Sequence, residues 1–239
     1  NANKKYGGEL TLVDGLAQSK NTISAYLMKR VGPRKVIKLA RKMGITSYLP
    51  AVPSLCLGTA EISLFEMTGA YSTFANSGIY MEPYFVSRIE DKNGVVIETF
   101  TNSPKEILSE DKNIVMVKLL QGVINRGSGS RLRWKYKMNN EIAGKTGTTQ
   151  NHSDGWFIGF VPDLVTGVWT GADNRAVRFR DLKLGQGAQM ALPIWGEYMN
   201  SLYSDSLIEL NKARFEIPKN SNNITLDCSD KTQIENEEF

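Results

Sequence analysis

The chain of 239 residues is 41% hydrophobic and 23% charged, a composition typical of a globular protein with one large domain or at most two small ones. Its net charge of +4 is mild and argues against a dedicated nucleic-acid-binding protein, because such proteins concentrate basic charge much more strongly. No apolar run approaches the ~20 residues of a membrane-spanning helix, and the opening Asn1-Ala-Asn-Lys4 reads as the interior of a longer polypeptide.

Helical spacing dominates the first part of the sequence. It predicts one helix over Leu10–Val31 and a second over Pro33–Met43, with Gly32 at the break between them. Ser63-Leu-Phe-Glu66 has the capping-box pattern of a helix start, and it opens a third helix that Gly78 stops.

A β-hairpin and a fourth helix follow. Asn93-Gly94 is a strong turn signal between two strands, predicted over Tyr84–Glu90 and Val95–Phe100. The fourth helix is predicted over Asp111–Asn125.

The last third of the sequence predicts mostly strands. These are Arg131–Met138, Glu141–Thr148, Gly155–Val161 and Thr166–Ala172, followed by a closing helix over Ala188–Tyr203. The first strand alternates basic and apolar residues over Arg131–Lys137, so we expect a solvated basic face, with contact to an anionic wall polymer or membrane surface as the alternative.

Helices first and antiparallel strands later indicate an α/β fold, with an antiparallel sheet flanked by helices and a mostly helical part. We expect one domain over residues 1–203. Residues 204–239 are polar and irregular, and are predicted to form a partly ordered C-terminal extension.

The scarcity of histidine limits the chemistry. His152 is the single histidine and lies in a polar turn, where a solvated loop residue is the ordinary expectation. The sequence fits neither a metal site nor a catalytic Ser-His-Asp triad or Cys-His dyad. No glycine-rich phosphate-binding loop precedes a helix. We therefore expect no metal and no cofactor, and any acyl-transfer chemistry would use lysine as its proton carrier.

Lys145-Thr-Gly-Thr-Thr149 is the most informative segment, because an aromatic strand follows it. On a strand, Thr146 and Thr148 share one face and offer two hydroxyls to one carboxylate, while Lys145 lies on the other face and adds positive charge. Gly147 has no side chain, so a peptide can pair along this edge, and the Thr148 N–H can hold an oxyanion. The alternative is an ordinary exposed strand that carries a lysine.

Ser19-Lys20-Asn21 lies within the first predicted helix. Serine and asparagine are poor residues for a helix interior, so together they indicate a bend or a functional junction. This segment and the Lys145 segment together resemble the transpeptidase domain of class A penicillin-binding proteins: Ser19-Lys-Asn21 is similar to the second motif of that family and Lys145-Thr-Gly147 to the third. The resemblance covers about residues 8 to 200, through segments that include Leu57–Met67, Ala70–Gly78, Asp154–Phe160 and Pro193–Trp195.

The resemblance implies a penicillin-binding/serine β-lactamase-like transpeptidase fold. It also implies a D,D-transpeptidase that cross-links peptidoglycan stem peptides ending in D-Ala-D-Ala through an acyl-serine, with β-lactams as substrate mimics. By this resemblance, Ser19 would relay a proton to the leaving amine and Asn21 would hydrogen-bond the substrate backbone. Lys145 would stabilise Ser19 electrostatically. Thr146 and Thr148, which flank Gly147, would hold the terminal carboxylate.

The family's first motif, Ser-x-x-Lys, is expected upstream of Ser19. No serine precedes Ser19 in this chain, and Ser109-Glu-Asp-Lys112 fits better as the start of the fourth helix. We therefore expect the nucleophilic serine and its lysine outside these residues, and the chain alone to be inactive.

The implied whole protein is membrane-anchored at the outer face of the bacterial cytoplasmic membrane, with a glycosyltransferase domain in an upstream part of the polypeptide. Its partners would be stem peptides and β-lactam antibiotics, with no nucleic acid. Two other functions stay open on the sequence: a non-catalytic domain of the same fold that senses peptidoglycan or β-lactam, and a serine β-lactamase or carboxypeptidase.

Overall fold

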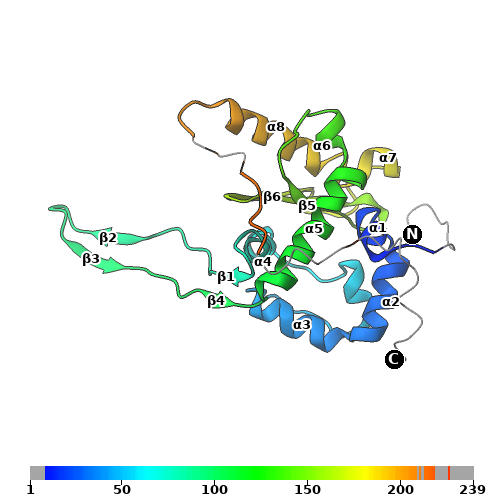
Figure 1. The fold of residues 1–239 in the computed structure, drawn as a ribbon, viewed down its shortest axis with the longest axis horizontal. Coiled ribbons are helices and arrows are strands. Elements are labelled where there is room, and N and C mark those ends of the chain that lie inside the picture. Colours follow the sequence, from blue (N-terminus) through cyan, green and yellow to red (C-terminus); the bar gives the residue numbers. More distant parts are fainter. Residues whose placement is uncertain (1–8, 209, 211–212, 219–225, 227–239) are drawn as a thin grey trace.

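A three-stranded antiparallel sheet forms the centre of the protein (Figure 1). The computed structural model describes residues 9–208, 210, 213–218 and 226. The strands are β5 (Ala143–Thr148), β6 (Asp154–Val161) and β7 (Leu164–Gly171), hydrogen-bonded in the order β5-β6-β7. Val161 pairs with Leu164, so the two intervening residues form a tight hairpin turn.

Two buried clusters cover opposite faces of this sheet, because successive residues of a strand point to opposite sides. Helix α8 (Ala191–Ser204) covers one face, where Phe157 of β6 packs edge-on against Trp195 with ring centroids 5.4 Å apart. Helix α5 (Glu110–Arg126) covers the other face, where Phe160 belongs to the same cluster as the helix residues. Figure 1 shows α8 and α5 on the two sides of the sheet.

The predicted fourth helix is confirmed as α5. Ser109 takes the extended conformation of an N-cap, and Glu110 and Asp111 in the first turn complement the helix dipole. The buried residues of α5 that face the sheet recur at helical spacing: Ile114, Val117, Leu120 and Ile124.

The single helix predicted over Leu10–Val31 is wrong in one respect: the structure breaks it into α1 (Leu12–Ala17) and α2 (Asn21–Val31). Between them Ser19 has a left-handed φ of 54°, which no residue of a continuous helix adopts. The bend indicated by the serine and asparagine is therefore confirmed. Thr11 caps α1 by accepting a hydrogen bond from the backbone N–H of Asp14.

Helices α3 (Pro33–Lys42) and α4 (Leu64–Ala75) confirm the second and third predicted helices. Pro33 is the first residue of α3, where its missing N–H has no intrahelical partner to lose. The capping box of α4 is present in full, since Ser63 accepts from the backbone of Glu66 and Glu66 accepts from the backbone of Ser63. A short 3₁₀ helix, η1 (Pro53–Leu57), precedes α4.

The strand predicted over Arg131–Met138 is wrong. The structure has α6 (Arg131–Trp134) there, because Leu132 and Tyr136 are buried four residues apart while Trp134 is exposed. The four basic residues therefore do not share one strand face: Lys135 and Lys137 are exposed, whereas Arg133 donates hydrogen bonds to the backbone carbonyls of Met138 and Asn140.

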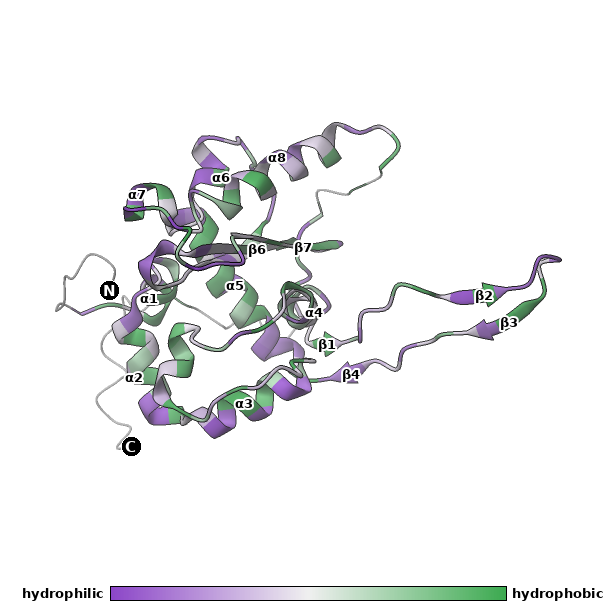
Figure 2. Ribbon diagram, turned by 180° about the vertical axis from the view of Figure 1, so that it is seen from behind, coloured by the Kyte–Doolittle hydropathy of each residue, from purple (hydrophilic) through white to green (hydrophobic). Residues whose placement is uncertain are grey.

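The predicted hairpin is a narrow ribbon, β2 (Arg88–Glu90) paired with β3 (Val96–Thr99), and it extends far from the sheet. Its strands mix hydrophilic and hydrophobic residues (Figure 2), and every residue of both is exposed. At its base, β1 (Ile79–Tyr80) pairs with β4 (Lys105–Glu106).

The described part of the chain after α8 returns to the body of the fold. Phe215 is buried against Phe160, with ring centroids 5.6 Å apart, and its backbone N–H donates to Glu141 Oε2 at 2.9 Å. The remainder of the extension predicted over residues 204–239 lies largely outside the described residues.

Candidate active site

Strand β5 carries the Lys145-Thr-Gly-Thr motif at an edge of the sheet, within the part of the chain that the structure describes. Lys145 lies opposite Ile158 of β6, and Thr146 lies opposite Phe157. Residues that face each other across an antiparallel pair share a side of the sheet, so Thr146 and Lys145 point to opposite faces. As expected from the alternation of side chains along a strand, Thr146 and Thr148 lie on the α8 side of the sheet and Lys145 lies on the α5 side.

Lys145 and Ser19 meet in the folded chain. The Lys145 Nζ donates a hydrogen bond of 2.8 Å to Ser19 Oγ and another of 2.9 Å to the backbone carbonyl of Thr146. Burial lowers the pKa of Lys145 to about 8, because removing an ammonium from water disfavours its charged form. The break between α1 and α2 places the Ser19 hydroxyl at this position, on an exposed turn with left-handed backbone.

Asn21 is exposed and is the first residue of α2, two residues beyond Ser19. The structure therefore places Ser19, Asn21 and Lys145 in one region of the surface, since the turn that carries the first two is joined to the third by a hydrogen bond.

Thr146 has a partner that sequence reasoning missed. Its hydroxyl lies 2.6 Å from the hydroxyl of Ser128, in the turn that follows α5, and the Thr146 residue is only 9% exposed. The signal in the sequence was Gly127-Ser-Gly-Ser130, a glycine–serine turn directly after a helix. Nothing in that turn pointed to a threonine further along the chain.

Thr148 and Gly147 contact the segment before α8. The Thr148 Oγ1 accepts a hydrogen bond of 3.0 Å from the backbone N–H of Gly187. A Cβ added to Gly187 would lie 2.2 Å from the carbonyl oxygen of Gly147, so these two stretches of backbone can approach only because Gly187 has no side chain. This close approach depends on Gly187, and the pairing of a peptide along the strand edge at Gly147 stays a prediction.

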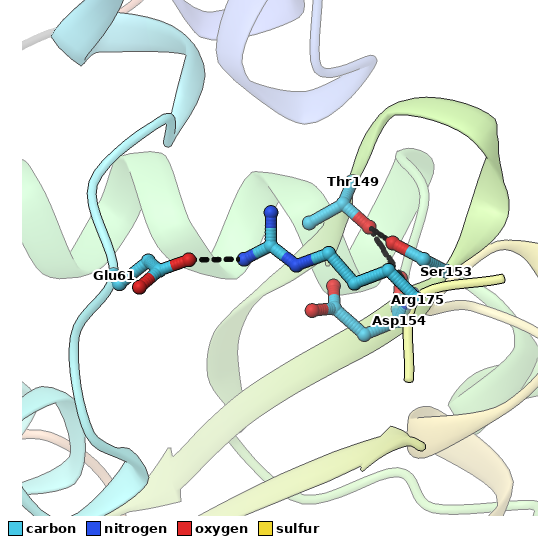
Figure 3. Close-up of polar contacts among 5 residues, drawn as sticks. All are labelled: Glu61, Thr149, Ser153, Asp154 and Arg175. Atoms are coloured by element: carbon cyan, nitrogen blue, oxygen red, sulfur yellow. Dashed lines mark hydrogen bonds and ion pairs between the residues drawn. The ribbon is translucent and has the colours of Figure 1, made fainter. Parts of the chain in front are cut away.

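The region beyond β5 is held by polar contacts (Figure 3). Thr149 Oγ1 lies 2.9 Å from Ser153 Oγ, and it accepts from the backbone N–H of Asp154 at 3.1 Å. Arg175, from the segment after β7, reaches Glu61 in the approach to α4, with 2.6 Å between charged atoms. A cavity of about 310 Å³ opens next to Ser153.

His152 is part of the segment that joins β5 to β6. It lies in the short 3₁₀ turn η2 (Gln150–His152) with a left-handed φ of 59°, half-buried, and its Cβ packs against Gly185 of the short helix α7 (Leu182–Gly185).

Ser109-Glu-Asp-Lys112 lies far from the turn that carries Ser128. Ser109 starts α5, whereas Ser128 follows the other end of that helix. The 17 residues of α5 span about 25 Å at 1.5 Å per residue. This Ser-x-x-Lys sequence therefore forms the start of a helix, as expected.

Among the described residues, no cluster of three or more histidine, cysteine or acidic side chains is arranged to hold a metal ion. No described helix has the length and apolar character needed to cross a membrane.

Comparison with known proteins gives the family. Residues 1–174 match the family described as "Transpeptidase: Penicillin binding protein transpeptidase domain". Penicillin-binding protein 1A of Aquifex aeolicus is 37% identical over 199 residues, which cover 83% of this chain and 26% of that protein. Penicillin-binding protein 2D of Bacillus subtilis is 33% identical, covering 91% of this chain and 31% of the relative. The chain thus spans about a quarter to a third of the length of these relatives.

Solved structures agree on the fold. Penicillin-binding protein 1A from Haemophilus influenzae matches with a TM-score of 0.80 at 24% identity, over 92% of this chain and 37% of that one. The penicillin-binding protein PonA1 from Mycobacterium tuberculosis matches with a TM-score of 0.75 at 25% identity, over 91% of this chain and 62% of that one. PonA1 is also known in complex with penicillin V. The chain has the α/β fold of these proteins and belongs to the penicillin-binding protein transpeptidase-domain family.

Proposed function

We propose that the chain is the substrate-holding part of a peptidoglycan D,D-transpeptidase. The observation that carries this proposal is the hydrogen bond from Lys145 Nζ to Ser19 Oγ, because it joins the two segments that resemble the family's second and third motifs. Family membership supports the reaction class, and the edge position of β5 leaves backbone groups available to an extended peptide.

In the proposed reaction a serine oxygen attacks the carbonyl carbon of the penultimate D-alanine, and the bond to the last D-alanine breaks. The base lysine takes the proton of the attacking serine and returns it to Ser19, while Ser19 passes its own hydroxyl proton to the nitrogen of the leaving D-alanine. The Lys145 ammonium, 2.8 Å away, stabilises the negative charge that develops on Ser19 Oγ. An amine of a neighbouring stem peptide then attacks the acyl-serine and completes the cross-link.

The remaining roles concern substrate binding. The hydroxyls of Thr146 and Thr148 hold the terminal carboxylate of the stem peptide, and the Asn21 side chain binds its backbone. Thr148 N–H stabilises the oxyanion of the tetrahedral intermediate, since a backbone donor on a rigid strand needs no reorganisation in the transition state. Gly147, which has no side chain, lets the backbone of a bound peptide approach the strand edge.

We further propose that the nucleophilic serine and base lysine belong to a part of the polypeptide outside these residues. Ser109-Glu-Asp-Lys112 is the single Ser-x-x-Lys sequence in the chain, and it forms the start of α5, at the other end of that helix from Ser128. The full-length protein is then a membrane-anchored enzyme at the outer face of the cytoplasmic membrane, with an upstream glycosyltransferase domain. Residues 1–203 form its partial transpeptidase domain and 204–239 a C-terminal extension, of which Phe215 packs against the domain.

Intact-mass analysis with a labelled penicillin tests the proposal. We expect the full-length protein to gain one penicillin on a serine upstream of Ser19, and the 239-residue chain alone to gain none. A full-length protein that takes up no label would contradict the proposal. A protein that is acylated yet never exchanges the terminal D-alanine of a stem peptide for another D-amino acid would instead be a sensor of the same fold.

A further inference from the structure

The turn Gly127–Ser130 holds together the two segments of the candidate site. The backbone N–H of Ser128 donates a 3.0 Å hydrogen bond to the carbonyl of Ala17, at the end of α1. Its hydroxyl lies 2.6 Å from Thr146 Oγ1 on β5. A Cβ on Gly127 would lie 2.1 Å from the same Ala17 oxygen, so the turn can sit this close only with glycine there.

The direction of the Ser128–Thr146 hydrogen bond decides what Thr146 can do. A threonine hydroxyl has one proton and two acceptor lone pairs. If Thr146 donates to Ser128, it turns only lone pairs toward a bound carboxylate, and the two groups repel each other. If Ser128 donates to Thr146, the Thr146 proton is left for the carboxylate.

We propose that Ser128 is a positioning residue, whose hydroxyl donates to Thr146 Oγ1 and thereby directs the Thr146 proton to the carboxylate of the stem peptide or β-lactam. The inference rests on the proposed function, in which Thr146 binds that carboxylate. Ser128 and Thr146 reinforce each other in this arrangement, because a hydroxyl that accepts a hydrogen bond becomes a better donor. No other side-chain hydrogen bond of Ser128 is present in the described part of the chain, so its proton has no competing acceptor there.

The test compares two substrates on the same protein: a penicillin with its free carboxylate and the methyl ester of that penicillin. In the full-length wild type the acid should acylate faster than the ester. In Ser128→Ala the acid should slow by about ten- to a hundredfold, the range for one hydrogen bond to a charged group, while the ester changes little. Ser128→Thr, which restores a hydroxyl, should recover most of the preference for the acid.

Ser130→Ala is the matched control, because Ser130 lies in the same turn and its side chain makes no hydrogen bond to the described residues. It should keep the wild-type ratio of acid to ester rates. Ser128→Cys, with a weak S–H donor, should give an intermediate ratio, and it provides a second variant if Ser128→Ala folds poorly.

The outcomes separate this inference from the proposed function. If Ser128→Ala slows the acid and the ester equally, or slows neither, Ser128 does not act on carboxylate recognition and the inference is wrong. If the wild type is acylated by neither substrate, the proposed function fails and the inference with it.

Discussion

Lys145 Nζ lies 2.8 Å from Ser19 Oγ, although 126 residues separate them in the sequence. The lysine is held by strand β5, whose backbone is paired with β6, and the serine by a break between two helices. One partner is thus part of a rigid sheet and the other is on a turn with strained backbone. Their contact is the point at which the helical part of the fold meets the sheet at the candidate site.

The charge of Lys145 should control acylation at alkaline pH. Because its pKa is lowered to about 8, about nine-tenths of the molecules carry the ammonium at pH 7 and few do at pH 9.5. We expect the rate of penicillin acylation of the full-length protein to fall as pH rises through about 8. Lys145→Arg, which stays charged, should acylate more slowly overall but lose this pH dependence. A wild-type rate that stays flat from pH 7 to pH 9.5 would contradict the prediction.

The same group should affect stability. The unfolded chain holds the lysine proton up to its ordinary pKa of 10.5, while the folded chain releases it near 8. Between these values the unfolded state binds more protons, so the free energy of unfolding rises with pH there. Denaturant titrations at pH 7.5 and 10 should show the wild type gaining stability relative to Lys145→Met. If the difference between the two proteins is constant with pH, the lysine is not desolvated in the folded chain.

The Ser19 backbone should carry strain that serves the site. A left-handed φ of 54° costs a non-glycine residue about 1–2 kcal/mol, and glycine avoids most of that cost. Ser19→Gly should therefore be more stable than Ser19→Ala by about 1 kcal/mol in thermal unfolding. Both variants should lose most of the acylation activity, because both lack the hydroxyl. Activity that survives in either variant would show that the hydroxyl is dispensable.

Gly127 and Gly122 form a matched pair for the packing of α5. Alanine at Gly127 would place its Cβ 2.1 Å from the Ala17 carbonyl oxygen, so we expect Gly127→Ala to destabilise the protein by about 1–3 kcal/mol and to slow acylation by moving Ser128. At Gly122 the Cβ meets only Val13 Cγ1 at 3.7 Å, so Gly122→Ala should stabilise the helix by about 0.5–1 kcal/mol. Equal effects of the two substitutions on stability would refute this account of the turn.

Glu66 should contribute stability that is lost in acid. Burial alone would raise its pKa, but hydrogen bonds from Ser47, Thr46 and Ser63 outweigh burial and hold the pKa well below its ordinary value of 4.5. A carboxyl with a lowered folded pKa stabilises the fold above pH 4.5 and loses that contribution as the pH falls further. At pH 7, Glu66→Gln should cost about 1–2 kcal/mol, and this cost should shrink below pH 4.

Glu61→Gln is the control for that experiment. Its ion pair with Arg175 is exposed, and such pairs contribute at most about 1 kcal/mol. If Glu61→Gln destabilises the chain as much as Glu66→Gln does, the hydrogen bonds around Glu66 have no special role.

Local rules were enough for much of the fold. The capping box at Ser63 and the proline that starts α3 are each fixed by neighbouring residues, and each appears where the sequence predicted it. The strand prediction for Arg131–Met138 was wrong because the spacing of Leu132 and Tyr136 suits either a strand or a helix. Burial decides between strand and helix here, because both side chains are buried in the cluster beside α8 and Trp134 is exposed.

The sequence by itself determined the family, the motif strand, and which residues of that strand face which side, because these depend on residue types and short spacings. The tertiary structure alone decided that Ser19 reaches Lys145, that Ser128 reaches Thr146, and that Gly187 packs on Gly147. Each of these contacts joins segments far apart in the chain. Their distances follow from how α5 and α8 pack on the two faces of the sheet, and no local pattern encodes that packing.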